Sequence, residues 1–349
     1  MSIDGKRILV TGGTGSLGQR VVRRLLDGGA GGRPAKVTVL SRDEAKQHDM
    51  RLRFLRRGAA TDDVIYEHTR DLLAFRIGDV RDFTTLVEAV GDADIVIHAA
   101  ALKQVPTCEY FPAEAIKTNV LGADALVRAT VAAGGRVEAV IGISTDKACK
   151  PINVMGMTKA VMERILVEAN LRQPKTRFAC VRYGNVVASR GSVVPLFLEQ
   201  IARGGPVTVT LKEMTRFLLT LDGAVDTVLA ALDGARAGEI YVPRVPAARM
   251  IDLAETLIDG RDIPISYTGI RPGEKIHEIM VSEEECHRTI ERGDYYVVCP
   301  MLPECNPVDA KGGVLSSEYS SADITLDKDG LRALLAPYLT APLPAEFNA

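Results

Sequence analysis

The chain has 349 residues, of which 46% are hydrophobic, and its 43 basic and 45 acidic side chains give a net charge of −2. This near balance excludes a global field that would attract nucleic acid. With no signal peptide and no apolar run long enough to span a membrane, we expect a cytoplasmic protein with neither nucleic-acid nor membrane partners.

The first predicted strand leads directly into a glycine-rich turn. Arg7–Val10 is short and apolar, Thr11–Gly18 carries spaced glycines, and apolar residues then recur at helical spacing. In such a turn Gly12 permits the tight bend, Gly15 lets the backbone approach a pyrophosphate, and Gly18 lets the helix pack on the strand. The helix N-terminus attracts the negative charge. We therefore predict a dinucleotide site whose first contacts are Thr11, Gly12, Thr14, Gly15, Ser16, Leu17 and Gly18.

The tip of the second predicted strand, Lys36–Leu40, favours NADP over NAD. An acidic residue at this position binds the ribose of NAD, whereas an arginine accommodates the 2′-phosphate of NADP. The tip here is Ser41-Arg42, with Lys46 beyond it. Asp43-Glu44 is interpreted as the start of a helix, where acidic side chains suit the helix dipole. NAD stays an alternative.

Further apolar runs alternate with helical patterns. Strands are predicted at Phe75–Val80, Ile95–Ala101 and Val140–Ile143. Helices are predicted at Phe83–Val90, Ala113–Ala133 and Met157–Asn170. This alternation requires right-handed crossovers around a buried parallel sheet, so the expected fold class is α/β, a Rossmann-type doubly wound sheet.

The carboxyl ends of these strands carry further candidate contacts to the cofactor, because open α/β sheets bind ligands at that edge. Asp79 and Val80 are placed to meet the adenine. The small side chains of Ala99, Ala100 and Ala101 would let the backbone lie along the cofactor, although close helix packing is an alternative explanation for them.

A hydroxyl, a carboxylate and an amine follow the strand Val140–Ile143 in the segment Ser144–Lys147. Lys159 lies twelve residues later and can reach the same cleft from the following helix. An isolated Thr-Asp-Lys is usually an exposed turn, but its position at the mouth of a dinucleotide-binding sheet favours acid–base chemistry.

The domain prediction follows from where the pattern becomes irregular. Residues 1–185 are expected to form the NADP-binding domain, with contributions from about 215–245, and residues 186–214 and 246–349 a smaller substrate-binding lobe. No metal site is predicted, because the six cysteines and five histidines show no ligand spacing. The basic cluster Arg51, Arg53, Arg56 and Arg57 is interpreted as a solvated helix face or subunit contact.

Together these residues resemble the extended short-chain dehydrogenase/reductases, and within them the soluble UDP-N-acetylglucosamine 4,6-dehydratases of polysaccharide synthesis. The resemblance covers most of the chain and extends beyond the glycine turn to several segments: Gly78–Asp82, His98–Lys103, Lys117–Asn119, Ser144–Lys147, Val181–Asn185, Ser189–Pro195, Met214–Phe217 and Arg271–Lys275.

The resemblance implies a redox-neutral cycle. Bound NADP⁺ takes hydride from C4 of the sugar, water is eliminated across C5 and C6, and hydride returns to C6. Lys147 matches the base at C5, Asp146 the group that helps water leave, Thr145 a contact near O4, and Lys159 the holder of the nicotinamide ribose. A cationic nicotinamide and Lys159 should lower the pKa of Lys147.

The resemblance also implies the substrate contacts. Arg216 and Arg271 match arginines that bind the diphosphate, a task suited to the guanidinium fork, and Asn185 would position the sugar or phosphate. The remaining implied contacts are Lys103, Asn119 and Tyr183 to the cofactor, and Lys103, Val193 and Glu274 to the substrate. The expected partner is a nucleotide sugar, UDP-N-acetylglucosamine first, and the expected assembly a homo-oligomer, dimer or hexamer.

Two departures from the family pattern stand out. Met155 occupies the position where the superfamily has tyrosine, which points toward the branch that inverts C5, and the segment Arg57–Ala74 is longer than expected. An epimerase acting at C3 or C4 therefore stays an alternative, because it would need the same cofactor and diphosphate contacts. A non-catalytic NADP-binding protein is a further alternative, against which the Asp146-Lys147 pair argues.

Overall fold

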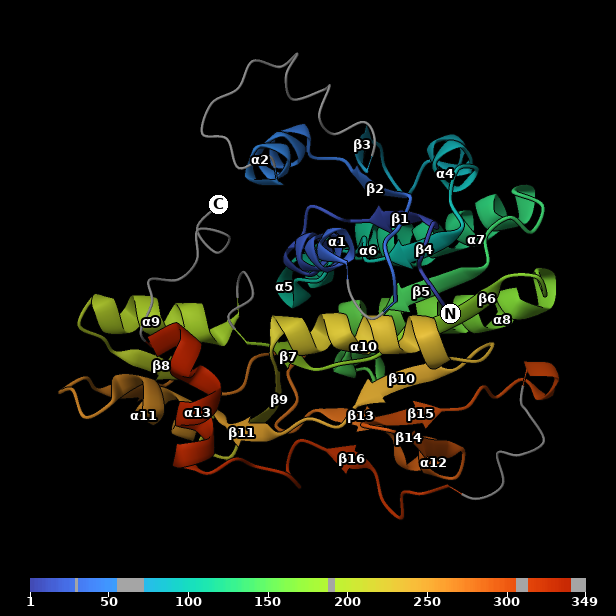
Figure 1. The fold of residues 1–349 in the computed structure, drawn as a ribbon. Helices are drawn as coiled ribbons and strands as arrows, with labels where there is room; N and C mark the ends of the chain where they lie inside the picture. The colour runs from blue at the N-terminus through green and yellow to red at the C-terminus, as the bar shows by residue number, and fades with distance from the viewer. Residues whose placement is uncertain (29–30, 55–71, 188–191, 306–312, 340–349) are drawn as a thin grey trace.

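The structure, a computed structural model, describes residues 1–28, 31–54, 72–187, 192–305 and 313–339. Its largest element is a nine-stranded sheet (Figure 1). The strands follow one another in the order β14 (Thr289–Arg292), β15 (Tyr295–Val298), β10 (Ile240–Pro243), β6 (Arg177–Val181), β5 (Ala139–Ile143), β4 (Ile95–His98), β1 (Arg7–Thr11), β2 (Lys36–Ser41) and β3 (Leu73–Ile77).

The sheet is parallel from β3 to β10, and only β15 and β14 run antiparallel. The predicted α/β doubly wound class is confirmed. The strand order reverses between β1 and β4, so their carboxyl ends open a crevice of the kind that binds nucleotides in this architecture. The strand expected at Phe75–Val80 begins and ends earlier in the structure. It is β3, Leu73–Ile77, and Asp79 and Val80 lie in the loop beyond it.

Helices cover both faces of the sheet. On one face α1 (Ser16–Asp27), α2 (Glu44–Phe54) and α10 (Leu221–Gly234) pack against β1 and its neighbours. On the other face lie α4 (Phe83–Val90), α7 (Gly122–Ala132) and α8 (Val154–Arg172). Figure 1 shows the two layers on either side of the strands.

The predicted helix Phe83–Val90 is confirmed, whereas two other helices differ from expectation. Helix α8 begins at Val154 because the Asn153 side chain caps it, accepting a hydrogen bond from Gly156 N at 2.8 Å. The expected single helix Ala113–Ala133 consists of α6 (Pro112–Ala115), a π-helical segment η1 (Ile116–Leu121) and α7.

A second core lies in the carboxyl-terminal part of the chain. Helices α9 (Val193–Ala202), α11 (Met250–Ile258) and α13 (Lys328–Leu339) pack on the paired strands β8 (Val207–Val209) and β12 (Ile265–Tyr267), and Figure 1 shows these helices grouped away from α4 and α7. The small sheets are β11 (Ala247–Arg249), β9 (Thr215–Leu219) and β7 (Asn185–Val186), and β13 (Ile279–Val281) with β16 (Tyr319–Ser320).

The predicted domain boundaries stay a prediction, although one segment crosses them. Strands β14 and β15 lie within the range assigned to the substrate lobe, yet they extend the large sheet by pairing with β10. The large core therefore draws on both ends of the chain.

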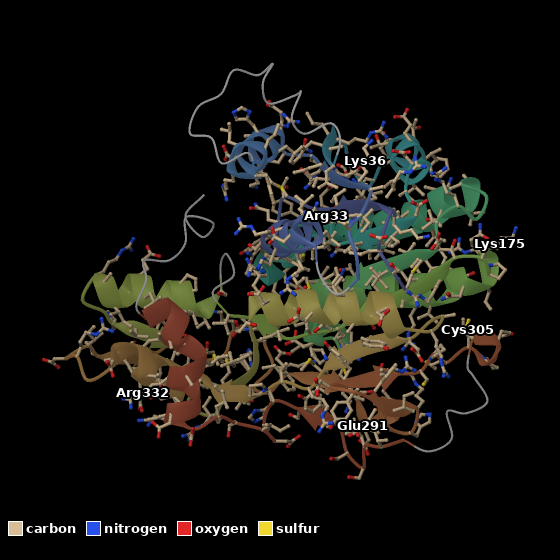
Figure 2. All side chains as sticks on the ribbon, in the orientation of Figure 1. Arg33, Lys36, Lys175, Glu291, Cys305 and Arg332 are labelled. Atoms are coloured by element: carbon tan, nitrogen blue, oxygen red, sulfur yellow. The ribbon has the colours of Figure 1, made fainter. Side chains whose placement is uncertain are left out.

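Figure 2 shows the charged side chains of Lys175, Glu291 and Arg332 at the periphery of the molecule. Among the described residues no helix is long and apolar enough to cross a membrane. Large apolar side chains are exposed at Tyr110, Phe111 and Leu121. The expected homo-oligomer stays a prediction.

The basic cluster departs from a simple solvated face. Arg51 lies over the Phe75 ring with 4.8 Å between the guanidinium carbon and the ring centroid, and Arg53 donates to Gln19 at 3.5 Å. Both arginines are half-buried. Arg56, Arg57 and most of the Arg57–Ala74 segment lie outside the described residues.

Candidate functional site

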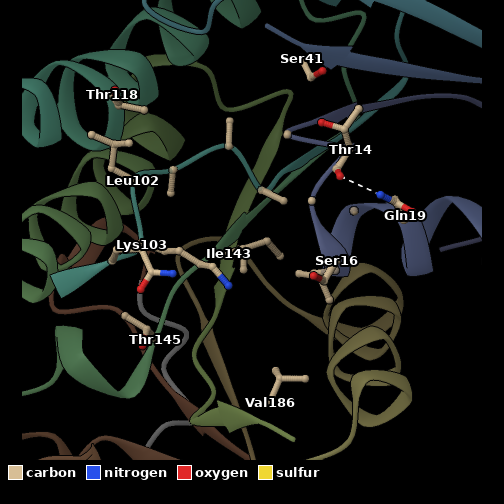
Figure 3. A pocket seen from close by; sticks show the side chains of 18 of the residues that line it. Thr14, Ser16, Gln19, Ser41, Leu102, Lys103, Thr118, Ile143, Thr145 and Val186 are labelled. Carbon is tan, nitrogen blue, oxygen red and sulfur yellow. Dashed lines mark hydrogen bonds between the residues drawn. The ribbon is translucent and has the colours of Figure 1, made fainter. Parts of the chain in front are cut away.

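A cavity of about 630 Å³ opens at the crevice between β1 and β4. It extends from the glycine turn before α1 to the loop that follows β5, and Figure 3 shows Ser16, Lys103 and Thr145 around the same space. The sequence placed its candidate cofactor and catalytic residues at these two ends, and the structure joins them in one cavity.

The glycine turn is shaped for a close ligand approach. Gly12 has a φ of +67°, and a Cβ there would lie 2.7 Å from the Ala100 backbone. A Cβ on Gly18 would lie 2.5 Å from Gly13 Cα, so α1 could not pack as it does. Gln19 donates to the Thr14 carbonyl at 2.8 Å, drawn as the dashed line in Figure 3, and fixes the turn from inside the helix. The turn leaves helix N-terminal amides beside the cavity, as a pyrophosphate requires.

The tip of β2 forms the far wall of the cavity. Arg42 is half-exposed, lines the cavity, and lies 3.5 Å from the Asp79 carboxylate. Ser41 is buried, and Gln47 of α2 donates to its carbonyl at 3.0 Å. Arg42 thus places a positive charge at the cavity wall, next to the Ser41 backbone that the Gln47 side chain holds by a hydrogen bond. Lys46 also lines the wall but is paired with Asp43 at 2.8 Å.

Most of the residues predicted from the sequence line this cavity. They are Gly12, Thr14, Gly15, Ser16, Leu17, Gly18, Ser41, Arg42, Lys46, Asp79, Val80, Ala99, Ala100, Ala101, Lys103, Thr145, Lys147, Met155, Lys159, Tyr183 and Asn185. The predicted residues outside the lining are Thr11, Asn119, Asp146, Val193, Arg216, Arg271 and Glu274.

Two of those outside residues support the cavity wall from behind. Asn119 is fully buried and holds the Leu102 backbone, accepting from its N–H at 2.8 Å and donating to its carbonyl at 2.9 Å. Thr11 is also fully buried and contacts His98 Nδ1 at 2.8 Å, while Ala100 N donates to the Thr11 hydroxyl at 3.4 Å. Both side chains are therefore occupied by protein groups.

The Thr145-Asp146-Lys147 segment forms a single turn, η2 (Asp146–Ala148), at the other end of the cavity. The buried Asp146 carboxylate accepts from the Thr145 hydroxyl at 2.7 Å and from Lys147 Nζ at 3.0 Å, and its second oxygen has no partner among the described residues. Lys147 Nζ also donates to Asn185 at 3.3 Å. Helix α8 packs tightly on this turn, because a Cβ on Gly156 would collide with the Lys147 carbonyl.

The sequence analysis predicted that a cationic nicotinamide and Lys159 lower the pKa of Lys147. The protein's own groups do the opposite and raise it. Burial lowers the pKa of Lys147, but the carboxylates of Asp146 and Glu278 outweigh burial and the positive charge of Arg216, so the pKa is raised. Glu278 was absent from the sequence-based expectation, and it accounts for part of the difference. The lysine is held as an ammonium ion between two carboxylates.

Lys159 has the opposite environment. It is 5% exposed, and burial lowers its pKa to about 8. Its Nζ donates to the Met162 sulfur at 2.8 Å. Met155 is buried one helical turn earlier at the cavity wall, where its thioether cannot exchange protons. Burial and the charge of Lys159 lower the pKa of His98 to about 3, so His98 is neutral.

The substrate residues implied in the later part of the chain differ in placement. Arg216 is buried and donates to the Ile276 carbonyl at 3.1 Å, close to Glu278. Arg271 is 60% exposed and lies 3.8 Å from Glu274. Val193 begins α9 beside Ser192, which does line the cavity. The loop that carries Arg271 and Glu274 is tied to the catalytic turn, because Asn153 donates to the Gly273 carbonyl and Lys275 to that of Cys149, at 2.8 and 2.6 Å.

Behind the turn lies a buried ionic network that sequence reasoning missed. Arg182 is 1% exposed and pairs with Glu163 at 2.7 Å and Glu285 at 2.8 Å. Ser144 donates to Glu163. The network connects the end of β5 to α8 and to α12 (Glu283–Cys286) in the later part of the chain.

Sequence reasoning also missed Thr118, Ile143, Ser192 and Leu221, which line the cavity. None of these four residues is a glycine or carries a charged group, so no signal in the sequence identified them. Cys149 is buried, and burial, the largest effect on it, raises its pKa to about 12, which fits a structural thiol rather than a nucleophile. Within the described ranges, no cluster of three or more His, Cys, Asp or Glu could hold a metal ion.

Known proteins are similar to this chain over most of its length. The UDP-glucose 4-epimerase of Rickettsia typhi is 44% identical over 300 residues, which cover 85% of this chain and 83% of the relative. The solved structure of Pen from Bacillus thuringiensis is 31% identical with a TM-score of 0.83, and the match covers 97% of this chain and 99% of that one.

A more distant structure shares the fold. DesIV, a dTDP-glucose 4,6-dehydratase of Streptomyces venezuelae solved with NAD bound, is 24% identical with a TM-score of 0.64, over 77% of this chain and 86% of that one. The family described as "Polysaccharide biosynthesis protein" matches residues 8–300. The chain therefore belongs to this polysaccharide biosynthesis protein family.

Proposed function

We propose that this protein is an NADP-dependent nucleotide-sugar 4,6-dehydratase that acts on UDP-N-acetylglucosamine and gives a 4-keto-6-deoxy sugar. The observation that carries the proposal is the Asp146-Lys147 pair, which lies at one end of the cavity that begins at the glycine turn. Hydride transfer alone needs no such pair, whereas removal of a carbon-bound proton and loss of water need an acid and a base.

The glycine turn, Arg42 and Lys159 would hold the cofactor, and the crowding at Gly12 and Gly18 supports this fit. Bound NADP⁺ would supply the hydride acceptor for C4 of the sugar and the donor for C6. The chain's own residues orient the sugar: Asn185 and Thr145 line the cavity next to Lys147, and guanidinium groups from the second lobe would neutralise the diphosphate.

Proton transfer is the task of the catalytic turn. A 4-keto group acidifies the C5 proton. Transfer of the Lys147 ammonium proton to Asp146, 3.0 Å away, would leave the neutral amine that accepts the C5 proton while the C5–C6 double bond forms. Asp146 would then give its proton to the C6 hydroxyl, which leaves as water. Lys147 returns a proton to C5, and the proton released from O4 restores its ammonium form. Met155 cannot take the O4 proton, so we assign that transfer to Thr145 with water or to Lys159.

Proton NMR of purified protein with UDP-N-acetylglucosamine tests this function. We expect a new C6 methyl doublet and no stoichiometric accumulation of NADPH, because the cycle is redox-neutral. Absence of the doublet, with steady formation of reduced cofactor, would show a simple dehydrogenase instead.

A nucleotide-sugar 4-epimerase is the second candidate, supported by the name of the 44% identical Rickettsia relative. The same experiment with UDP-glucose and UDP-N-acetylglucosamine separates the two. Altered ring signals without a methyl doublet would establish epimerisation.

Arg42 is expected to select NADP⁺. Replacement by alanine should weaken NADP⁺ binding by about 1.5–3 kcal/mol, the scale of a charge-assisted hydrogen bond, and leave NAD⁺ nearly unchanged. Calorimetric titration with both cofactors measures this. Arg76→Ala is the control, because Arg76 lies on the adjacent strand, pairs with Glu88 at 3.1 Å and does not line the cavity. Equal losses for both cofactors would contradict the assignment.

Met155 and Lys159 are expected to respond differently to substitution. Met155→Leu roughly keeps the buried volume and removes no titratable group, so most of the activity should remain. Lys159→Ala should weaken cofactor binding and slow hydride transfer together. Cofactor titration and single-turnover kinetics distinguish the two, and a Met155→Leu variant as inactive as Lys159→Ala would contradict the prediction.

A further inference from the structure

We propose that Glu278, which directly precedes β13, is a positioning residue for Lys147, and that it balances the two cations that face it, Lys147 and Arg216. The inference rests on the proposed function only for its kinetic consequence. The contacts that support it stand independently of the reaction catalysed.

Glu278 lies 131 residues after Lys147 in the chain but beside it in the fold. It is 2% exposed, and its Oε1 is 3.7 Å from Lys147 Nζ and 3.7 Å from Arg216 Nε. Its backbone is fixed just before β13, because Ser321 Oγ accepts from Glu278 N at 2.9 Å and Ser321 N donates to the Glu278 carbonyl at 2.8 Å. Its Oε2 is buried and has no partner among the described residues.

A buried carboxylate with an unused oxygen is costly unless neighbouring charges compensate for it. Asp146 and Glu278 supply two negative charges, and Lys147 and Arg216 supply two positive charges. On α8, which packs on the turn, Lys159 lines the same cavity, and Glu163 is already paired with Arg182. Removal of Glu278 would therefore leave two cations facing one carboxylate.

The balance has a functional consequence. The negative charge of Glu278 stabilises the ammonium form of Lys147, while Arg216 opposes it. Glu278 thus favours the protonated form of Lys147, so the free amine that can act as a base forms at a higher pH. Replacing it with the neutral glutamine should make Lys147 a free amine at lower pH.

The test compares wild type with Glu278→Gln by two measurements. The first is pH-dependent acetylation of Lys147, followed by mass spectrometry, which reports the pKa of this amine without any turnover. The second is the pH profile of kcat/KM with UDP-N-acetylglucosamine. We expect the labelling midpoint and the acid limb to fall together, by about one pH unit or more.

Matched variants separate a specific effect from a structural one. Glu318→Gln removes the carboxylate 2.8 Å from the exposed Lys150 and should alter the labelling of Lys150 but not that of Lys147. Arg216→Met removes the opposing cation and should raise the Lys147 midpoint, which keeps the test decisive if Glu278→Gln does not fold. Unchanged Lys147 labelling in the folded Glu278→Gln variant would overturn the proposal. A shifted midpoint in a protein that turns over no nucleotide sugar would support Glu278 and refute only the proposed function.

Discussion

Replacement of Lys147 by alanine is expected to reduce product formation by at least about 10²–10⁴-fold, the contribution of a positioned acid–base group. The loss should appear in kcat with substrate binding nearly intact, because Asn185, Thr145 and the rest of the cavity wall remain. Kinetics and calorimetric binding of UDP-N-acetylglucosamine measure the two quantities separately.

Solvent exchange gives an independent readout of the same role. In deuterium oxide the wild type should place deuterium at C5 of the product, because Lys147 exchanges its proton with water before returning it. Lys150→Ala serves as the control. Lys150 lies three residues after Lys147 in the sequence, but it is exposed and paired with Glu318. An active Lys147→Ala variant, or a C5 position that keeps its original hydrogen, would make the epimerase the better account.

Replacement of Arg182 by methionine should have the largest effect on stability. Arg182 pairs with Glu163 and Glu285 in a fully buried network, and removal of one member leaves carboxylates unpaired. We expect a loss of about 3–5 kcal/mol in the free energy of unfolding, measured with urea. Arg172→Met is the control on α8, the helix that carries Glu163, because the pair of Arg172 with Glu168 is partly exposed and should contribute at most about 1 kcal/mol.

The pH dependence of that loss follows from Glu285. Burial would raise the pKa of Glu285, but the charge and hydrogen bonds of Arg182 overcome it and lower the pKa to about 2. A lowered pKa means that the stabilisation is present above the unfolded-state pKa, near 4.5, and is lost as the pH falls toward 2. The difference between wild type and Arg182→Met should therefore shrink over this range. A difference that is constant with pH would show that packing, not charge pairing, causes the loss.

Local patterns predicted the strands β1, β2, β4 and β5 of the large sheet and the glycine-turn end of the cavity. The apolar strand, glycine turn and helix from Arg7 onward carry their own signals, since each depends on neighbouring residues. The π-helical segment η1 was missed because its composition differs little from that of an α-helix, although it places Thr118 at the cavity wall and Asn119 behind it.

The catalytic end of the site shows where local reasoning stops. Glu278 reaches Lys147 only because β13 packs against η2, and sequence spacing does not encode that approach. The predicted sign of the Lys147 pKa shift was wrong because the prediction counted only cations: it left out the charge of the adjacent Asp146 and that of Glu278, which comes from far along the chain.

The order of strands in the large sheet has a consequence for how the protein is synthesised. The chain leaves the sheet after β10, builds much of the second lobe, and returns only at β14 and β15 to cover the exposed side of β10. Until the ribosome has passed Val298, the last residue of β15, the nascent sheet presents the unpaired edge of β10, which is a template for joining another chain. The growing polypeptide therefore most needs protection by chaperones between the synthesis of β10 and the synthesis of β15.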